Sequence, residues 1–131
     1  MYLVEISPNS ALIEGRPIRL ANAPKLMTNN NVTLNEDCSG LIIQAPGVYK
    51  IKMLLTVLST SNGIGVSLRV DGDEVTTTEA TFDDGEVGEL VIDYPINVLH
   101  DEDGGHKVLI ELHAMFAGEI YGGHVIVERV I

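Results

Sequence analysis

Hydrophobic and polar residues alternate along much of this chain with a period of two. The longest example runs from Gly47 to Leu58, where alternate positions fall on opposite sides of an extended strand. One side is apolar and is predicted to be core, with Tyr49, Ile51, Met53, Leu55 and Val57. The other side is mixed, with Val48, Lys50, Lys52, Leu54, Thr56 and Leu58. A mixed side of this kind suits a surface that is partly covered by something else.

Two later segments, 107–116 and 124–131, repeat this pattern. Their apolar sides add core positions at Val108, Ile110, Leu112, Val125 and Val127. Their mixed sides carry Leu109, Glu111, His113, Met115, His124, Ile126, Glu128 and Val130. The three mixed sides together would expose a larger apolar patch than a lone soluble domain usually tolerates, which favours oligomerisation. Lysines on one strand and glutamates on the other two could pair across strands or subunits. An ordinary amphipathic outer face is the alternative interpretation.

Turn signals separate the remaining extended segments. Ala45-Pro46-Gly47, Asp71-Gly72 and Asp83-Asp84-Gly85 are typical turn sequences. Between such turns we expect short strands at 2–6, 25–27, 32–34, 41–44, 64–70, 74–82 and 89–94, a continuation or bend at 95–99, and the last turns at 118–123. Within 11–20 we expect two short extended pieces around Glu14-Gly15-Arg16-Pro17. No segment has convincing helical periodicity over ten or more residues, which predicts an all-β, antiparallel two-sheet sandwich or jelly roll. We expect one domain over 1–131, with 1–12 as a possible attachment segment.

The charge of the chain is unevenly distributed. The 131 residues carry a formal net charge of −11, and the interval 71–103 holds twelve Asp or Glu and no Lys or Arg. Proteins that bind the phosphate backbone need clustered basic residues, so nucleic acid is not an expected partner. No apolar run reaches the length of a membrane span, and the N-terminus has no pattern typical of an export signal. We therefore expect no membrane insertion.

Histidines and glutamates provide one candidate for a metal site. A cupin-type jelly roll binds metal through imidazoles and a carboxylate, and here His113 and His124 would join Glu111 and Glu128. The chain contains no His-x-His pair, so surface or interface histidines are the simpler interpretation. A cupin-like metal enzyme is therefore only a minor alternative.

Acidic turns provide a second, weak metal candidate. Asp71, Asp73, Asp101 and Asp103 could bind calcium, but neither turn continues as a helix-loop-helix calcium loop, and a solvated acidic rim is the simpler interpretation. The single cysteine, Cys38, rules out an internal disulfide. No nucleophile elbow or phosphate-binding loop is present. We expect no cofactor and no catalysis.

Several stretches resemble the tumour necrosis factor and complement globular-head superfamily. They are IEGRPIRLAN, SGLIIQAPGVYKIKMLLTV, SLRVDGDEV and GGHVIVERVI. The resemblance implies a jelly roll of about ten strands, assembled as a homotrimer, with an inner sheet formed by 47–58, 107–116 and 124–131 facing the threefold axis. The expected trimer interface then comprises Lys50, Lys52, Leu54, Leu58, Leu109, Glu111, His113, Met115, Ile126, Glu128 and Val130.

Within this superfamily the short chain looks most like a component of a bacteriophage particle. We expect a non-enzymatic structural or binding module of a phage or prophage: a head fibre, a capsid decoration or a receptor-binding tail component. Its expected partners are further copies of itself, other virion proteins contacted through the N-terminus, and a host receptor or glycan. Its expected location is the virion surface, after synthesis in the bacterial cytoplasm. The main alternative is a bacterial adhesin-like domain that binds a cell-surface glycan or protein.

Overall fold

A computed structural model describes residues 2–5, 10–20, 32–35, 39–60, 63–81, 83–98 and 107–130, and these form ten β-strands. The strands are β1 (Tyr2–Glu5), β2 (Ser10–Leu12), β3 (Val32–Leu34), β4 (Gly40–Ile43), β5 (Gly47–Ser59), β6 (Ile64–Val70), β7 (Asp73–Ala80), β8 (Val87–Val98), β9 (Val108–Ala114) and β10 (Gly118–Arg129). Within the described residues no helix is long and apolar enough to cross a membrane. The predicted strand at 25–27 lies outside the described residues.

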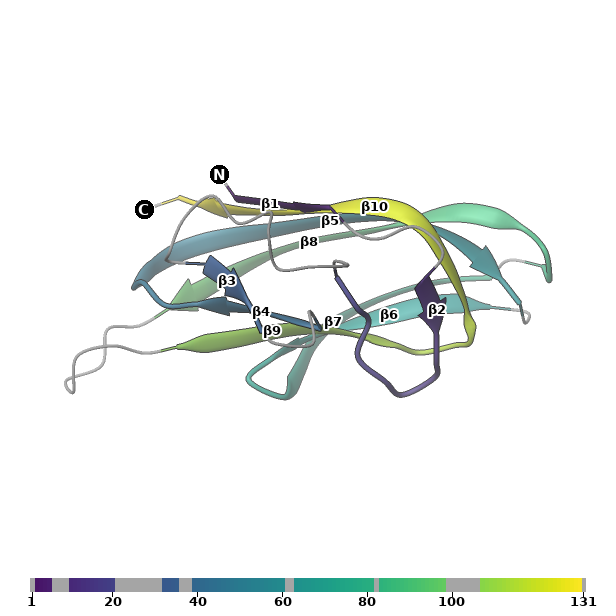
Figure 1. The fold of residues 1–131 in the computed structure, drawn as a ribbon, viewed down its shortest axis with the longest axis horizontal. Coiled ribbons are helices and arrows are strands. Elements are labelled where there is room, and N and C mark those ends of the chain that lie inside the picture. The colour runs from purple at the N-terminus through teal and green to yellow at the C-terminus, as the bar shows by residue number, and fades with distance from the viewer. Residues whose placement is uncertain are drawn as a thin grey trace.

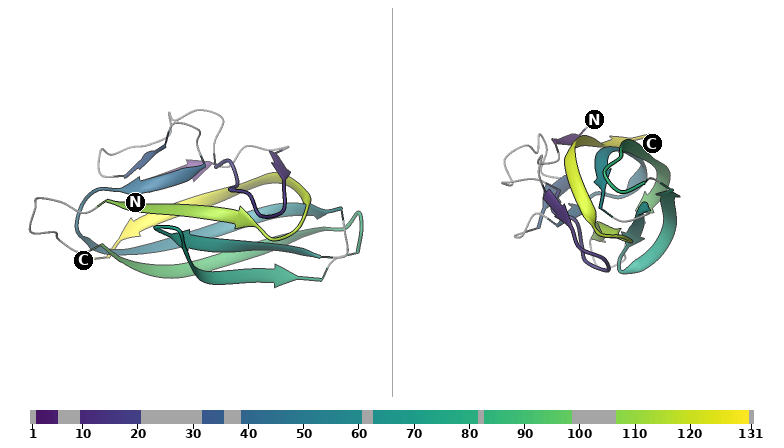
Figure 2. Two further views of the ribbon diagram at one scale, coloured as in Figure 1. Left: turned by 90° about the horizontal axis from the view of Figure 1, so that it is seen from below. Right: turned by 90° about the vertical axis from the view of Figure 1, so that its right-hand side faces the viewer.

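The strands form two antiparallel sheets that face each other. The first sheet has the order β1-β10-β5-β8, and β2 pairs with another stretch of β10. The second sheet has the order β3-β4-β9-β6-β7. Figure 1 shows the first sheet above the second, and Figure 2 shows the two sheets along and across the sandwich. The predicted all-β, two-sheet architecture is confirmed.

Strand alternation directs one side of each long strand into the space between the sheets. The side chains predicted to form the core are all buried: Tyr49, Ile51, Met53, Leu55, Val57, Val108, Ile110, Leu112, Val125 and Val127. The Tyr49 hydroxyl donates a hydrogen bond of 2.8 Å to the Ala45 carbonyl oxygen, so the one polar atom of this ring has a partner. Burial of these side chains supplies the main stabilising force of the fold.

Residues 10–20, which we call the closing segment, join the two sheets along one side of the sandwich (Figure 2). β2 pairs with β10 of the first sheet, and the Ile18 amide then donates a hydrogen bond to Leu112 in β9 of the second sheet. Leu12, Ile18 and Leu20 are buried in the core. In Figure 1 the closing segment, in purple, runs from β10 down to the second sheet. Both β1 and β2 of the proposed attachment segment are thus paired strands of the first sheet.

β10 begins earlier in the chain than the sequence predicted. Residues 118–123 were expected to be turns, but they continue the strand along β5, with a register shift between Ile120 and Gly122. The glycines suggested turns, whereas two of them instead permit close approach to β5. A Cβ at Gly118 would lie 2.7 Å from the Leu58 carbonyl oxygen, and a Cβ at Gly123 would overlap the Leu54 carbonyl oxygen.

β8 is one strand of 12 residues, so the segment after Pro95 continues the strand, which is one of the two outcomes expected for 95–99. Proline lacks a backbone N–H and is therefore confined to strand edges. β8 is an edge strand of the first sheet, with β5 as its neighbour on one side. Pro95 is accommodated because only one side of the strand takes part in the ladder.

Candidate functional site

The outer face of the first sheet carries apolar side chains that the core does not use. On β5, Leu54 and Leu58 are half-buried, and Ile126 on β10 is half-buried as well. Val91 lies in register with Leu54, and Val87 lies in register with Leu58. Among the described large apolar residues, those left exposed include Val87 at 58%, Val91 at 59%, Tyr121 at 42% and Val130 at 57%, all on or beside β8 and β10. We call this surface the outer face.

Charged residues cross the same outer face in two neighbouring rows. Lys52 lies in register with Asp93 on β8 and with Ile126 on β10, and Lys50 lies in register with Glu128. Lys50 Nζ approaches Asp93 Oδ2 at 3.5 Å, and both side chains are nearly half exposed. Solvent-exposed pairs of this kind contribute at most about 1 kcal/mol, so this pair adds little to the stability of the fold. The outer face thus has an apolar part around Leu54 and a charged part around Lys50.

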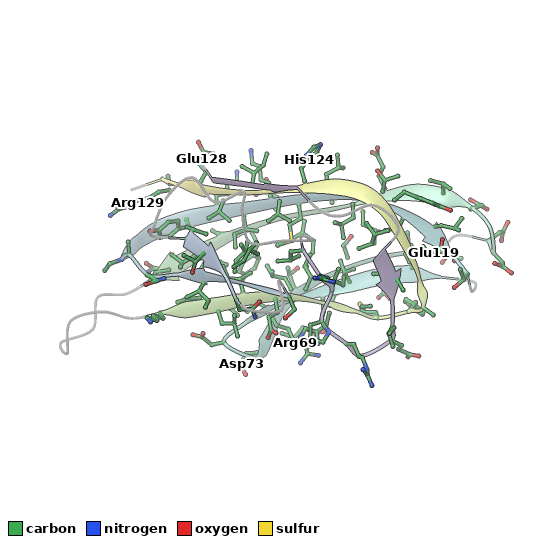
Figure 3. All side chains as sticks on the ribbon, viewed as in Figure 1. Arg69, Asp73, Glu119, His124, Glu128 and Arg129 are labelled. Atoms are coloured by element: carbon green, nitrogen blue, oxygen red, sulfur yellow. The ribbon has the colours of Figure 1, made fainter. Side chains whose placement is uncertain are left out.

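His124 lies on the apolar part. It is exposed, and its register partner on β5 is Leu54. In Figure 3 the side chains of His124 and Glu128 point away from the second sheet, while Arg69 and Asp73 lie on the opposite side of the molecule. The two sheets therefore present separate outer faces, directed away from each other.

The predicted trimer interface combined residues that the structure separates. Segment 107–116 was expected in the same sheet as β5 and β10, but β9 pairs with β4 and β6 in the second sheet. Leu109, Glu111, His113 and Met115 consequently lie on the far side of the sandwich from Lys50, Lys52, Leu54, Leu58, Ile126, Glu128 and Val130. The grouping was wrong because alternation identifies the two sides of a strand and does not identify its neighbours.

The same separation removes the candidate histidine metal site. His113 and Glu111 are close, with 3.8 Å between His113 Nε2 and Glu111 Oε1, but His124 and Glu128 belong to the other sheet. The described residues contain no group of three or more His, Cys, Asp or Glu that could hold a metal ion.

Asp71 has a structural role in its turn. Its Oδ1 accepts a hydrogen bond of 2.9 Å from the Leu109 amide, which ties the β6–β7 turn to β9. Asp73 follows as the first residue of β7 and is exposed. Asp101 and Asp103 lie outside the described residues.

β8 is the contribution to this site that the sequence interpretation missed. Val87, Glu89, Val91 and Asp93 alternate with buried Leu90 and Ile92, so a period-two signal was present. A strand was predicted at 89–94, but its exposed side was not considered as part of the apolar patch. The outer face comprises β10, β5 and β8, with β8 in the place that had been given to 107–116.

No protein-family profile and no curated protein sequence matches this chain. Solved structures do match its fold over nearly the whole length. Eiger TNF from S. frugiperda has a TM-score of 0.75 at 8% identity, covering 99% of this chain and 92% of its own. The globular domain of zebrafish complement 1qA protein has a TM-score of 0.71 at 14% identity, covering 99% and 96%. The PRD1 vertex protein P5 has a TM-score of 0.60 at 14% identity, covering 98% and 95%. The chain has the jelly-roll fold of tumour necrosis factor and complement globular heads.

Proposed function

We propose that this protein is a non-enzymatic module that assembles as a homotrimer and serves on the surface of a phage or prophage particle. The observation that carries the proposal is the outer face of the first sheet. It places half-buried Leu54 and Leu58 beside exposed Val87 and Val91, on a jelly roll similar to tumour necrosis factor and complement heads.

A second copy of the chain is the occupant that this face favours. Apolar side chains that would otherwise face water are covered when copies associate, at roughly 25 cal/mol for each Å² removed from water. The charged part also suits a neighbouring copy, since Lys52 is exposed and the β8 margin carries exposed Glu89 and Asp93. The acidic β8 margin of one copy can contact Lys52 of the next copy, and repeating this contact around an axis closes a ring.

The virion role is supported by the match to the PRD1 vertex protein. Other virion proteins would contact the N-terminal region, and we place that contact on β1 and β2 as paired strands of the first sheet. The acidic turns that precede and follow β7 would face outward, toward a host receptor or glycan. Asp71, Asp73, Asp83 and Asp84 are all exposed there.

The oligomeric state tests the proposal directly. Light scattering coupled to size-exclusion chromatography should give the mass of three chains for the wild-type protein at micromolar concentration. Val91→Glu should give the mass of one chain, because it adds a charge to a residue that is already 59% exposed and therefore contributes little to the core. A wild-type monomer would overturn the trimer.

Two further variants distinguish the outer face from the opposite side of the sandwich. Leu54→Glu and Leu109→Glu both place a carboxylate at a half-buried leucine of a strand that has neighbours on both sides, in the first and second sheet respectively. Leu54→Glu should dissociate the trimer, and Leu109→Glu should leave its mass unchanged. Circular dichroism on both variants checks that each is folded. Dissociation by Leu109→Glu alone would move the interface to the second sheet.

A further inference from the structure

A group of polar side chains lies on the outer side of the second sheet, opposite the surface proposed for assembly. It consists of Ser67 and Arg69 on β6 and of their register partners on β9, His113 and Glu111. Ser67 is 2% exposed, and the side chains of His113 and Glu111 are 17% and 18% exposed. In Figure 3 Arg69 lies on the opposite side of the molecule from His124. We call these four residues of β6 and β9 the polar cluster.

Two nitrogen atoms of the polar cluster have unmet hydrogen-bonding capacity. In the part of the chain that the structure describes, Arg69 Nε and His113 Nε2 are buried and have no hydrogen-bond partner. His113 Nε2 is 3.8 Å from Glu111 Oε1, which is beyond hydrogen-bond length. Buried polar groups in native proteins are nearly always paired, so these two atoms call for a partner. Neither nitrogen has a hydrogen bond to lose, so a small side-chain rotation toward a ligand would break none.

The charges around Arg69 select the kind of ligand. Its register partners on both sides are acidic: Glu111 on β9 and exposed Glu74 on β7. A negatively charged ligand would be repelled by these two carboxylates, and a positively charged one would be repelled by the guanidinium. A hydroxyl group is neutral, and it can accept a hydrogen bond from Arg69 while it donates one to Glu111. A sugar residue carries several hydroxyls at close spacing, which suits a cluster that combines donors and acceptors.

We propose that the polar cluster binds a neutral sugar residue, with Arg69 as the donor and Glu111 as the acceptor for its hydroxyls. The proposal rests on the function inferred above, and it selects the glycan from the two kinds of host ligand named there. The acidic turn that this function directs outward contains Asp71 and follows β6 directly, so the polar cluster lies beside it. All four residues come from one chain, and the site stays uncovered when the outer face of the first sheet is occupied.

Nuclear magnetic resonance titration of the full chain with neutral sugars tests this proposal. The probes are the methyl glycosides of glucose, galactose, mannose and N-acetylglucosamine. Each is added up to about 10 mM, where a complex with a dissociation constant of about 1 mM is about nine-tenths formed. At least one probe should shift the amide signals of the polar cluster and leave that of Leu54 on the first sheet unchanged. Absence of a shift in the polar cluster with all four sugars would overturn the proposal.

Arg69→Met tests the donor. It removes the guanidinium, keeps an unbranched side chain and breaks no hydrogen bond of Arg69 Nε. Loss of a hydrogen bond from a charged group should weaken sugar binding by about tenfold or more. Glu111→Gln removes the charge of the acceptor at nearly constant size; it should also weaken binding, and it replaces Arg69→Met if that variant does not fold.

Lys50→Met is the matched control for Arg69→Met. Lys50 is likewise a basic residue in register with a glutamate, but it lies on the first sheet. This variant should bind the sugar as the wild type does. Equal weakening by Arg69→Met and Lys50→Met would overturn the assignment to the polar cluster.

A charged sugar and the mass of the protein separate the remaining outcomes. Methyl glucuronide has the ring of methyl glucoside and carries a carboxylate, which Glu111 and Glu74 should repel. Tighter binding of methyl glucuronide than of every neutral sugar would overturn the neutral class. Absence of sugar binding by a protein with the mass of three chains overturns this site and leaves the proposed assembly intact. A wild-type monomer that binds the sugar overturns the assembly and leaves this site intact.

Discussion

Ile18 provides a sharp test of how the sandwich is closed. Its side chain is 2% exposed, and its amide donates a hydrogen bond of 2.7 Å to the Leu112 carbonyl oxygen. It therefore packs into the core at the point where the closing segment reaches the second sheet. Ile18→Ala removes three carbon atoms from that position and leaves the backbone hydrogen bond in place.

The expected loss follows from burial. Truncating a fully buried isoleucine to alanine costs about 2–5 kcal/mol, because apolar contacts are lost and a cavity remains. We expect a value near the middle of this range, about 3 kcal/mol. For a domain of this size that value corresponds to a melting temperature lower by about 10 °C.

Thermal and denaturant unfolding, followed by circular dichroism at equal protein concentrations, give this difference. Equal concentrations are needed because self-association raises the apparent stability. Ile13→Ala is the matched control, since it makes the same substitution in the same segment at a residue that is 55% exposed. The control should change the stability by no more than about 0.5 kcal/mol. Equal effects from the two variants would refute the packing of the closing segment.

Two further predictions concern glycine and charge. Gly123→Ala should destabilise the fold far more than Gly72→Ala, because a Cβ at Gly123 meets the Leu54 backbone. At Gly72, which has a φ of +88°, a Cβ meets nothing within 4 Å. Gly72→Ala therefore costs only the strain of a left-handed backbone, about 1–2 kcal/mol. Similar unfolding midpoints would contradict this difference. Lys50→Ala should lower the stability of the separated chain by less than about 1 kcal/mol, with the difference vanishing in about 1 M salt, because the Lys50–Asp93 pair is nearly half exposed. A loss that persists at high salt would contradict the assignment to charge.

Much of the fold could be predicted from alternation alone. β5, β6 and the apolar sides of β9 and β10 lie where the period-two pattern placed them, because a strand with one buried side requires that pattern. The error in strand extent at 118–123 and the choice left open at 95–99 both come from residues with more than one structural meaning. Glycine can mark a turn or a close approach between strands, and proline can end a strand or occupy its free edge. The neighbouring strands in the folded protein decide between these meanings. The pattern within a single strand does not specify those neighbours.

The candidate site shows the same limit at the level of sheets. The mixed side of β9 has the composition of the mixed side of β5, and nothing within either strand states that they belong to different sheets. In a sandwich every strand that is buried on one side has an outer side, so a search for mixed sides returns residues from both outer faces. Only strand order separates them. This is why Leu109 and Met115 were grouped with Leu54, and why Val91 was not.

Strand order also changes the argument for assembly. The residues of the predicted trimer interface are divided between two outer faces. Each face alone has a smaller apolar surface than predicted, which weakens the case for association through either one. β8 restores that case on one side only, because its two exposed valines extend the row of Leu54 and Leu58. The outer face of the second sheet is different in character. Between half-buried Leu109 and Met115, its central strands carry Glu111, His113, Ser67 and Arg69, which are polar side chains in register across β9 and β6. The asymmetry between the two faces, and not the total apolar area of the strands, is the physical reason to expect association through the first sheet.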